Sequence, residues 1–375
     1  MPSQRQAKRE PVEHAISERD ALYVRLVACG HGDTVLMHVP GGQWFLVDCN
    51  LPGEEKLEQF YDLARQLGMD RLDGVFLTHP HSDHFAGMAE VLSFFTEDGR
   101  SVGFYCDSGD WLNTFALVEE RQSARVFQEY VKLINRVAEL VNSGTIGLHC
   151  LDEDPRPFRV KDCSHPVHLV PVPPKASSVA GPAEGSSRGG QVTRSVRSMN
   201  ELCVIFVLQI SGDEDSFQML LGSDAKPDAM RTALSFWKDH EKNARSGLLE
   251  FDVIKVPHHG SLTGHLPKLC DAKRKNVPGV AAISCGTRWP PARSVIEDYR
   301  NRGWNVLATE IAQPSARPNR LIEQFDRSRP RGTDAGEEWE TVRRDIEISW
   351  TQRDGVRWPA NHPPLAPPHF DPCSS

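Results

Sequence analysis

The sequence has no apolar run close to the roughly 18 residues that a membrane-spanning helix requires. Its first 20 residues are polar and of mixed charge, and they lack the hydrophobic stretch of a secretory signal. Nine cysteines are present, but no two of them form a C-x-x-C pair, so no disulfide framework is indicated. These absences predict a cytoplasmic protein with reduced thiols and no membrane association.

Positive charge is not in excess either. The 375 residues carry a formal net charge of −8, with a pI of about 6.0, which argues against a protein that wraps nucleic acid over its whole surface. A local basic groove is still compatible with this balance. The hydrophobic content of 39% and the charged content of 25% are typical of a soluble globular protein.

The two ends and two internal segments differ in composition from the rest of the chain. Residues 1–20 are expected to form an arm, and the Pro-rich residues 359–375 a tail. Residues 21–358 are predicted to form one domain. This domain has a Ser/Gly/Arg-rich flexible insertion at 176–198 and a second insertion, rich in Arg, Pro and acidic residues, at 311–340.

Within the domain, short apolar segments predict strands, and longer segments of helical periodicity predict helices. The expected strands are 23–27, 35–39, 44–47, 202–208, 217–221, 251–256, 279–284 and 304–307, with a closing hairpin at 346–350 and 356–358. The expected helices are 54–67, 86–95, 114–141, 226–244 and 292–302. The domain is therefore expected to be of the α/β class.

The segment His79-Pro-His81-Ser-Asp83-His84 is the strongest motif in the chain. It follows the apolar run 75–77, which is expected to be a buried strand. Imidazole and carboxylate groups are the ligands that zinc and related divalent ions prefer. Four such groups at the end of one strand indicate a metal site far more than a histidine-rich surface turn.

Other polar residues also stand at the ends of expected strands. Asp48 follows one strand, Asp224 follows a second, and the pair His258-His259 follows a third. A histidine between 149 and 168 is a further candidate. In a layered fold the strand ends meet at one rim, so these residues are expected to converge with the motif.

The order Asp48, His79-x-His81-x-Asp83-His84, Asp224, His258 resembles the metallo-β-lactamase superfamily. That resemblance implies a four-layer αββα sandwich with loop insertions and a dinuclear metal centre. Over residues 22–310 the chain is more narrowly similar to the soluble domain of competence proteins of the ComEC type. The similarity lies in segments such as Gly30-His-Gly-Asp33 and Lys255-Val-Pro-His-His-Gly-Ser261.

The resemblance implies roles for the cluster residues. His79 and His81 would bind the first metal, and Asp83 and His84 the second, with Asp83 also counted as catalytic. Asp224 would bridge the two ions.

The remaining candidates have roles around that cluster. His258 would complete the second metal site, and His259 would be a catalytic phosphate contact or proton donor, because the two cannot point the same way on a strand. Asp48 is expected to orient a ligand imidazole or the bridging hydroxide. Asp33 is expected to be a turn former, and Ser261 a helix cap.

The superfamily supplies a third histidine to the first metal, and its position is open in this chain. The candidates are His149, His165 and His168. His168 is preferred because it lies on the apolar segment 167–170, although a packed or surface histidine is an equally good interpretation. The first metal site therefore has no assured third nitrogen ligand.

The function expected from these features is that of a dinuclear-metal-dependent hydrolase. A phosphodiesterase or nuclease that uses a metal-bridging hydroxide is favoured, with nucleic acid or another phosphodiester as substrate. The two ions are expected to be zinc, with manganese or iron as alternatives. A carboxylic ester, thioester or lactone hydrolase of the same fold is a second hypothesis, and a non-catalytic binding module with a degenerate metal site is a third.

Overall fold

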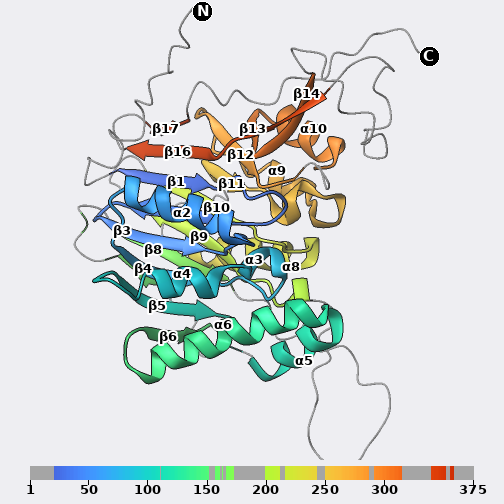
Figure 1. The fold of residues 1–375 in the computed structure, drawn as a ribbon. Coiled ribbons are helices and arrows are strands. Elements are labelled where there is room, and N and C mark those ends of the chain that lie inside the picture. Colours follow the sequence, from blue (N-terminus) through green and yellow to red (C-terminus); the bar gives the residue numbers. More distant parts are fainter. Residues whose placement is uncertain are drawn as a thin grey trace, which may run out of the picture.

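The computed structural model describes residues 21–109, 111–151, 157–160, 163, 166–172, 199–211, 216–242, 250–286, 291–314, 339–351 and 355–358. The predicted arm, the insertion at 176–198 and the tail lie outside these residues. Two large sheets pack face to face, with helices on the outer face of each (Figure 1). This is the mixed α/β fold that the sequence predicts.

The first sheet has eight strands in the order β17-β16-β1-β2-β3-β4-β5-β6. From β3 to β6 the strands are parallel. The strands of this sheet are β1 (Leu22–Leu26), β2 (Val35–Val39), β3 (Gln43–Val47), β4 (Arg71–Phe76), β5 (Ser101–Asp107), β6 (Gly147–Cys150), β16 (Ile346–Thr351) and β17 (Gly355–Arg357).

The second sheet has seven strands in the order β13-β12-β11-β10-β9-β8-β7. From β10 to β13 the strands are parallel. They are β7 (Phe158–Arg159), β8 (Val167–Val172), β9 (Ile205–Ile210), β10 (Phe217–Leu221), β11 (Val253–Lys255), β12 (Gly279–Ile283) and β13 (Trp304–Ala308). A separate hairpin, β14 (Glu310–Pro314) and β15 (Trp339–Arg343), contains the two ends of the predicted insertion 311–340.

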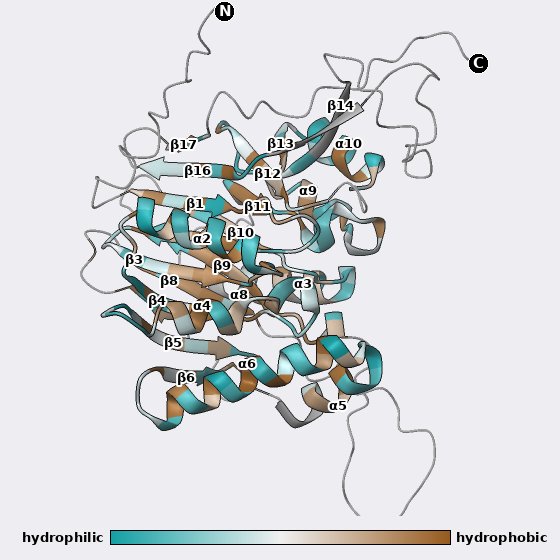
Figure 2. Ribbon diagram, viewed as in Figure 1, coloured by the Kyte–Doolittle hydropathy of each residue, from teal (hydrophilic) through white to brown (hydrophobic). Residues whose placement is uncertain are grey.

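Side chains from both sheets fill the space between them. Phe76 on β4 lies at the centre of an aromatic group, with ring-centroid distances of 5.4 Å to Phe104, 5.2 Å to Phe158 and 5.1 Å to Phe206. Phe206 belongs to the second sheet, so these edge-on contacts join the two layers. The side chains that face this space are apolar, and Figure 2 shows the central strand β9 in brown.

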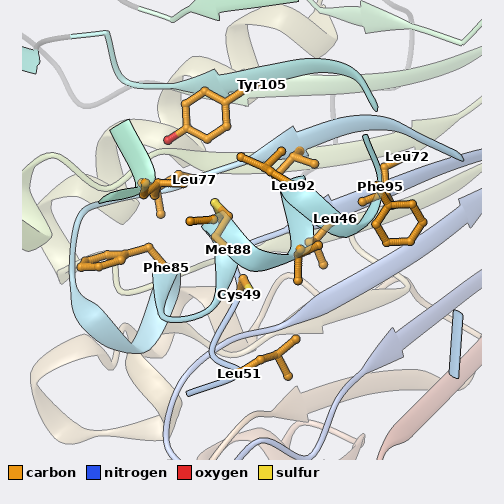
Figure 3. Packing of buried hydrophobic residues seen from close by; sticks show 14 of the residues in the cluster. Leu46, Cys49, Leu51, Leu72, Leu77, Phe85, Met88, Leu92, Phe95 and Tyr105 are labelled. Atoms are coloured by element: carbon orange, nitrogen blue, oxygen red, sulfur yellow. The ribbon is translucent and has the colours of Figure 1, made fainter. Parts of the chain in front are cut away.

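The helices form the two outer layers. The helices packed with the first sheet are α2 (Glu54–Gln66), α3 (Ser82–Phe85), α4 (Met88–Phe94), α5 (Trp111–Arg121) and α6 (Ala124–Asn142). Those packed with the second sheet are α8 (Pro227–Lys242), α9 (Pro267–Cys270) and α10 (Arg293–Asn301). Figure 3 shows how Leu46 and Leu72 of the first sheet pack with Met88, Leu92 and Phe95.

The predicted helix 114–141 is wrong in one respect, because the structure divides this segment into α5 and α6. Ser123 lies between them with an extended backbone, and its hydroxyl accepts a hydrogen bond from the Val126 N–H at 3.4 Å. A serine N-cap satisfies the unpaired donors of a helix start. The continuous polar–apolar periodicity hid this boundary.

Candidate metal centre

The candidate site lies at one edge of the sandwich, where the carboxyl ends of β3, β4, β10 and β11 meet. Asp48 follows β3, and the segment 78–84 follows β4. Asp224 follows β10, and His258-His259 follow β11. Because β3 runs parallel to β4, and β10 runs parallel to β11, the carboxyl ends of each pair open at the same edge. Both sheets thus contribute to one cluster of side chains.

A first donor group contains His79, His81 and Asp224. The His79 Nε2 lies 2.9 Å from the His81 Nδ1 and 3.9 Å from the Asp224 Oδ2. His79 and Asp224 are buried, whereas His81 is partly exposed. The Nδ1 of His79 lies 3.1 Å from the Thr78 hydroxyl. When this Nδ1–H donates to Thr78, the Nε2 lone pair of His79 faces the group.

A second donor group contains Asp83, His84, Asp224 and His259. The Asp224 Oδ1 lies 3.4 Å from the His84 Nε2 and 3.2 Å from the His259 Nε2. The His259 Nε2 is also 3.5 Å from the Asp83 Oδ2. Asp224 therefore belongs to both groups, with Oδ2 turned to the first and Oδ1 to the second.

Three of these atoms form no hydrogen bond within the described part of the protein. His84 Nε2, His259 Nε2 and Asp224 Oδ1 are buried and have no hydrogen-bond partner among the described residues. Leaving a buried polar atom unpaired costs free energy, so a cluster of such atoms indicates a missing ligand. Nitrogen and oxygen donors at these separations fit a divalent ion, whose identity the donor set leaves open.

Hydrogen bonds at Nδ1 orient the two imidazoles of the second group. The His84 Nδ1 lies 2.7 Å from the Asp48 Oδ2, and the His259 Nδ1 lies 2.9 Å from the Ser284 carbonyl oxygen. Each Nδ1–H donates, which leaves each Nε2 free to face an ion. Asp48 also accepts hydrogen bonds from the Thr78 N–H and hydroxyl, both at 2.8 Å. Asp48 thus has the geometry of a residue that orients a ligand.

The backbone at three of these positions is strained. Asp48, His258 and His259 all have positive φ values of 59°, 50° and 53°, respectively. Non-glycine residues rarely adopt this conformation, and it concentrates at functional sites because the surrounding structure must hold it. The left-handed turn at 258–259 follows β11, which ends at Lys255, one residue before the predicted end of the strand at 256.

Asp33 has a larger part in the site than a turn former. It is buried and forms an ion pair with the buried Lys255, and it accepts a hydrogen bond from the Ser284 hydroxyl. Its Oδ1 lies 3.6 Å from the His259 Nδ1. Burial opposes charge on Asp33, but Lys255 outweighs it and keeps the pKa of Asp33 below its ordinary value.

Two carboxylates of the second group are held ionised. Burial would raise the pKa of Asp224, but His259 and His84 together keep that pKa well below its usual range. The pKa of Asp83 is lowered as well, because His84 and His259 outweigh the effect of burial. A pair of ionised carboxylates beside unpaired imidazole nitrogens is an electrostatic environment that attracts a cation.

The structure places the two adjacent histidines differently from the expectation. His259, predicted to contact phosphate or donate a proton, is buried within the second group. His258, predicted to complete that group, has its Nε2 3.7 Å from the Asp224 Oδ2, on the side of the first group. The expectation assumed strand alternation, whereas both residues lie in a left-handed turn.

The two candidates for a third histidine that the structure describes, His149 and His168, do not lie in the first group. His168 pairs with Gln209 and Arg159, whereas the opposite end of β8, at Val172, lies nearer the site. His149 is exposed and its ring contacts Phe104 and Phe158. His165 is outside the described residues.

His31 is a site residue for which the sequence predicted no role. Its ring lies over that of His259 at a centroid distance of 4.2 Å, and its Nε2 is 3.7 Å from the Asp83 Oδ2. Burial and the neighbouring His259 lower the pKa of His31 to about 4. The available signal in the sequence was the flanking Gly32. Its φ is 130°, and an added Cβ would lie 2.4 Å from the Asp83 carbonyl oxygen, so a larger residue here would prevent the close approach to Asp83.

Residues 27–97 match the family model described as "Metallo-beta-lactamase superfamily". The matched segment contains Asp48 and the complete His79–His84 motif and ends before Asp224. A comparison with curated proteins finds no match. The narrower resemblance to ComEC-type domains stays a prediction.

Several solved structures are similar to this chain, at low identity and low TM-score. The metallo-beta-lactamase fold protein YhfI from Bacillus subtilis is 12% identical, with 76% of this chain and 95% of that chain covered and a TM-score of 0.38. A long form RNase Z from yeast is 11% identical, with coverages of 62% and 32% and a TM-score of 0.34. The subclass B3 metallo-beta-lactamase MEM-A1, isolated from a soil metagenome library, is 14% identical, with coverages of 64% and 76% and a TM-score of 0.31. At these scores the likenesses carry no information about activity.

None of the helices in the described part of the chain combines the length and the apolar character needed to cross a membrane. The two donor groups at the open edge are suited to divalent ions. Residues 27–97 thus resemble the metallo-β-lactamase superfamily, within a chain whose fold is mixed α/β with two sheets and flanking helices.

Proposed function

We propose that the protein is a hydrolase of phosphodiesters that depends on two divalent metal ions, with nucleic acid as the expected substrate. The observation that carries the proposal is the shared carboxylate of Asp224, whose two oxygens face two separate groups of nitrogen and oxygen donors. Two ions placed side by side suit an in-line displacement at phosphorus, because they act on both the attacking and the leaving oxygen.

The donor types support a phosphodiesterase over a β-lactamase-like hydrolase. Both groups consist of imidazole and carboxylate donors, with no thiolate in either of them. The nearby thiols of Cys29 and Cys49 are buried, and burial raises the pKa of each. They are therefore inert structural thiols.

The rim of the site is polar, which suits an anionic substrate. Asp83 and His258 have side chains that are each 25% exposed, and the His31 side chain is 34% exposed. The exposed hydroxyls of Ser261 and Thr263 lie beside His258. Imidazole and hydroxyl groups can donate hydrogen bonds to phosphate oxygens. These polar residues would not form the narrow apolar pocket that an acyl group requires.

The protein's own residues would orient the reaction. Bound divalent ions would supply Lewis-acid activation of water and of the phosphoryl group. Asp48 fixes the tautomer and direction of His84, and the Ser284 carbonyl does the same for His259. His31, neutral at physiological pH, lies next to Asp83 at the solvent side, where it can hydrogen-bond to the substrate.

Replacing Asp83 tests the proposal. The wild type is expected to cleave single- or double-stranded DNA, RNA or a generic aryl phosphodiester once it is loaded with zinc, manganese or iron. The Asp83→Ala variant removes one carboxylate from the second group and is expected to lose about a thousand-fold in kcat/KM, which corresponds to about 4 kcal/mol. Steady-state kinetics beside metal analysis of both proteins measure the effect.

Asp62→Ala is the matched control, because Asp62 is an exposed carboxylate on α2 that pairs only with the nearby Arg65 among the described residues. It should retain wild-type activity. Hydrolysis of esters, thioesters or lactones without phosphodiester cleavage would replace the proposal by the second hypothesis. A metal-free protein, or activity unchanged in Asp83→Ala, would refute it.

A further inference from the structure

A further group of possible metal ligands lies outside the candidate metal centre. His265, Cys270 and Asp298 each place one ligand atom within 4.8 Å of the others. His265 follows the short helix η3 (Leu262–Gly264), Cys270 is the last residue of α9, and Asp298 lies on α10. The group shares no residue with the two donor groups at the open edge. Three separate elements therefore bring their polar side chains together at a second place in the fold.

The chemistry of these three side chains suits zinc. An imidazole, a thiolate and a carboxylate are all established zinc ligands. Thiolate is a soft ligand that magnesium and calcium do not prefer, so its presence favours zinc over those ions. A tetrahedral ion with three protein ligands keeps one position for water. The Asp298 side chain is 35% exposed, so water can reach the group.

The imidazole of this group is not fully satisfied by the described part of the protein. The His265 Nε2 lies 2.7 Å from the Asp298 Oδ2, whereas the His265 Nδ1 is buried and has no hydrogen-bond partner among the described residues. This Nδ1 stays unsatisfied in either neutral tautomer, as a lone pair or as an N–H. A buried polar atom of this kind, beside a thiol and a carboxylate, indicates a ligand that the chain does not supply itself.

The Cys270 thiol is not placed to act as a nucleophile. The residue is completely buried, and burial raises the pKa of its thiol to about 12, whereas a nucleophilic cysteine needs partial exposure and a lowered pKa. Cys29 and Cys49 are buried as well, but neither belongs to a donor group among the described residues. Cys270 differs from them because an imidazole and a carboxylate lie beside it. A divalent ion bound by these groups can displace the thiol proton.

Neighbouring side chains hold the donors in place. The Arg302 Nη1 lies 3.3 Å from the Asp298 Oδ1, which leaves the Oδ2 of that carboxylate to face His265. The Trp304 Nε1–H donates to the Cys270 carbonyl oxygen at 2.8 Å and so joins the end of α9 to β13. Partners outside the ligand set orient the ligands in this way at metal sites.

We propose that His265, Cys270 and Asp298 bind a structural zinc ion that joins the segment 261–270 to α10. The segment contains only η3 and the four-residue helix α9, and helices of this length are not stable by themselves. An ion bound by donors from both sides adds its binding free energy to the folded arrangement. The inference concerns an ion separate from those of the candidate metal centre, and it depends on neither that centre nor its substrate.

Cobalt substitution tests the proposal, because the two donor groups at the open edge contain no thiolate. A near-ultraviolet charge-transfer band from thiolate to cobalt therefore reports on this group. The cobalt-loaded wild type should show the band, and Cys270→Ala should lose it. Cys106→Ala is the matched control, since Cys106 is also completely buried but belongs to none of the donor groups among the described residues. This control should keep the band.

Zinc analysis after equilibrium dialysis gives a second readout. The wild type should hold one zinc ion per chain more than Cys270→Ala. Asp298→Asn changes a partly exposed side chain without changing its size, so the variant is expected to fold. It should weaken this ion by more than about a hundred-fold, since the loss of an outer partner alone costs about ten- to a hundred-fold. Glu297→Gln, which alters an exposed carboxylate paired with Arg293 on the same helix, should leave the zinc content unchanged.

A folded, cobalt-loaded wild type without the charge-transfer band would overturn the proposal. A band of equal intensity in Cys270→Ala, or equal zinc content and affinity in the wild type and both variants, would overturn it as well. One zinc ion that depends on Cys270, in a protein whose open edge binds no metal and that cleaves no phosphodiester, would support this inference while refuting the proposed function.

Discussion

Burial changes the pKa of single residues in this protein, and Asp252 is an example. Asp252 precedes β11, and its Oδ2 accepts a hydrogen bond from the Gln218 N–H at 2.8 Å and lies 3.2 Å from the Arg274 Nη2. Burial raises the pKa of Asp252 from 3.8 to about 6 because it outweighs the attraction of Arg274. The ionised carboxylate is therefore less favourable in the folded protein than in the unfolded chain.

The sign of this effect predicts how stability changes with pH. Between pH 3.8 and 6 the folded protein binds a proton that the unfolded chain has released. The Asp252 carboxyl therefore lowers the free energy of unfolding more and more as the pH rises through this range, and the full loss is present above pH 6. Asp252→Asn should therefore gain on the wild type by about 2 kcal/mol between pH 4.5 and 7.5. Urea unfolding at both pH values measures the change, and Asp62→Asn should show none.

The adjacent histidines His258 and His259 show what the sequence could not predict about single residues. Residue chemistry and spacing selected His79, His81, Asp83 and His84, and the resemblance to the metallo-β-lactamase superfamily added Asp224; the structure brings these residues together. The choice between His258 and His259 required the backbone conformation, because a left-handed turn does not alternate side chains as a strand does. No local signal in the sequence defines such a turn.

At the scale of elements, the short helix α3 depends on the long helix α6. Only four residues long, α3 carries Asp83 and His84, and its Phe85 ring packs on Tyr130 of α6 at a centroid distance of 5.4 Å. Both rings are almost completely buried. Since four residues cannot hold a helix by themselves, this packing positions two ligands of the second group.

Tyr130→Ala should therefore affect both stability and metal binding. We expect a loss of about 3–5 kcal/mol in the free energy of unfolding, from the removed ring and the resulting cavity. Zinc affinity should fall for one of the two ions, because α3 loses its support. Denaturant unfolding and calorimetry measure the two effects. Gln128→Ala, at an exposed position on the same helix, should change stability by less than about 0.5 kcal/mol.

Helices and strands were predictable where the pattern of apolar and polar residues depends only on the segment itself. The strands 35–39 and 217–221 agree with β2 and β10 at both ends. By contrast, β5 was not predicted, although it is the parallel neighbour of β4. Gly103 stands in that strand because an added Cβ would lie 2.4 Å from the Asp73 carbonyl oxygen. A glycine of this kind weakens the strand signal, and only the neighbouring strand explains it.

For the whole molecule, the candidate metal centre draws its donor groups from both sheets. The first sheet and its connections contribute Asp48, His79, His81, Asp83 and His84, whereas the second contributes Asp224, His258 and His259. The Asp33–Lys255 ion pair crosses the same boundary. An ion that binds donors from both sheets stabilises the folded state over the unfolded chain by mass action.

Chelation should therefore lower the melting temperature. At about 1,000 times the dissociation constant each ion contributes about 4 kcal/mol, so removing two ions should lower Tm by roughly 10–20 °C. Scanning calorimetry with and without EDTA tests this. Asp224→Ala should show less than half of that shift, because its carboxylate belongs to both groups. An equal shift in the variant would contradict the bridging role of Asp224.

The pairing of β1 with β16 has a consequence for synthesis. The two strands join the beginning of the domain to its end, and the Arg25 and Asp345 side chains that hydrogen-bond beside them are separated by 320 residues in the chain. At about 5–20 residues per second, β1 waits roughly 15 to 60 seconds for this partner while the ribosome works. Throughout that interval β1 has one edge with unpaired backbone groups, which another nascent chain could occupy. The first sheet is thus completed only near the end of translation, and chaperone protection of β1 would matter most before then.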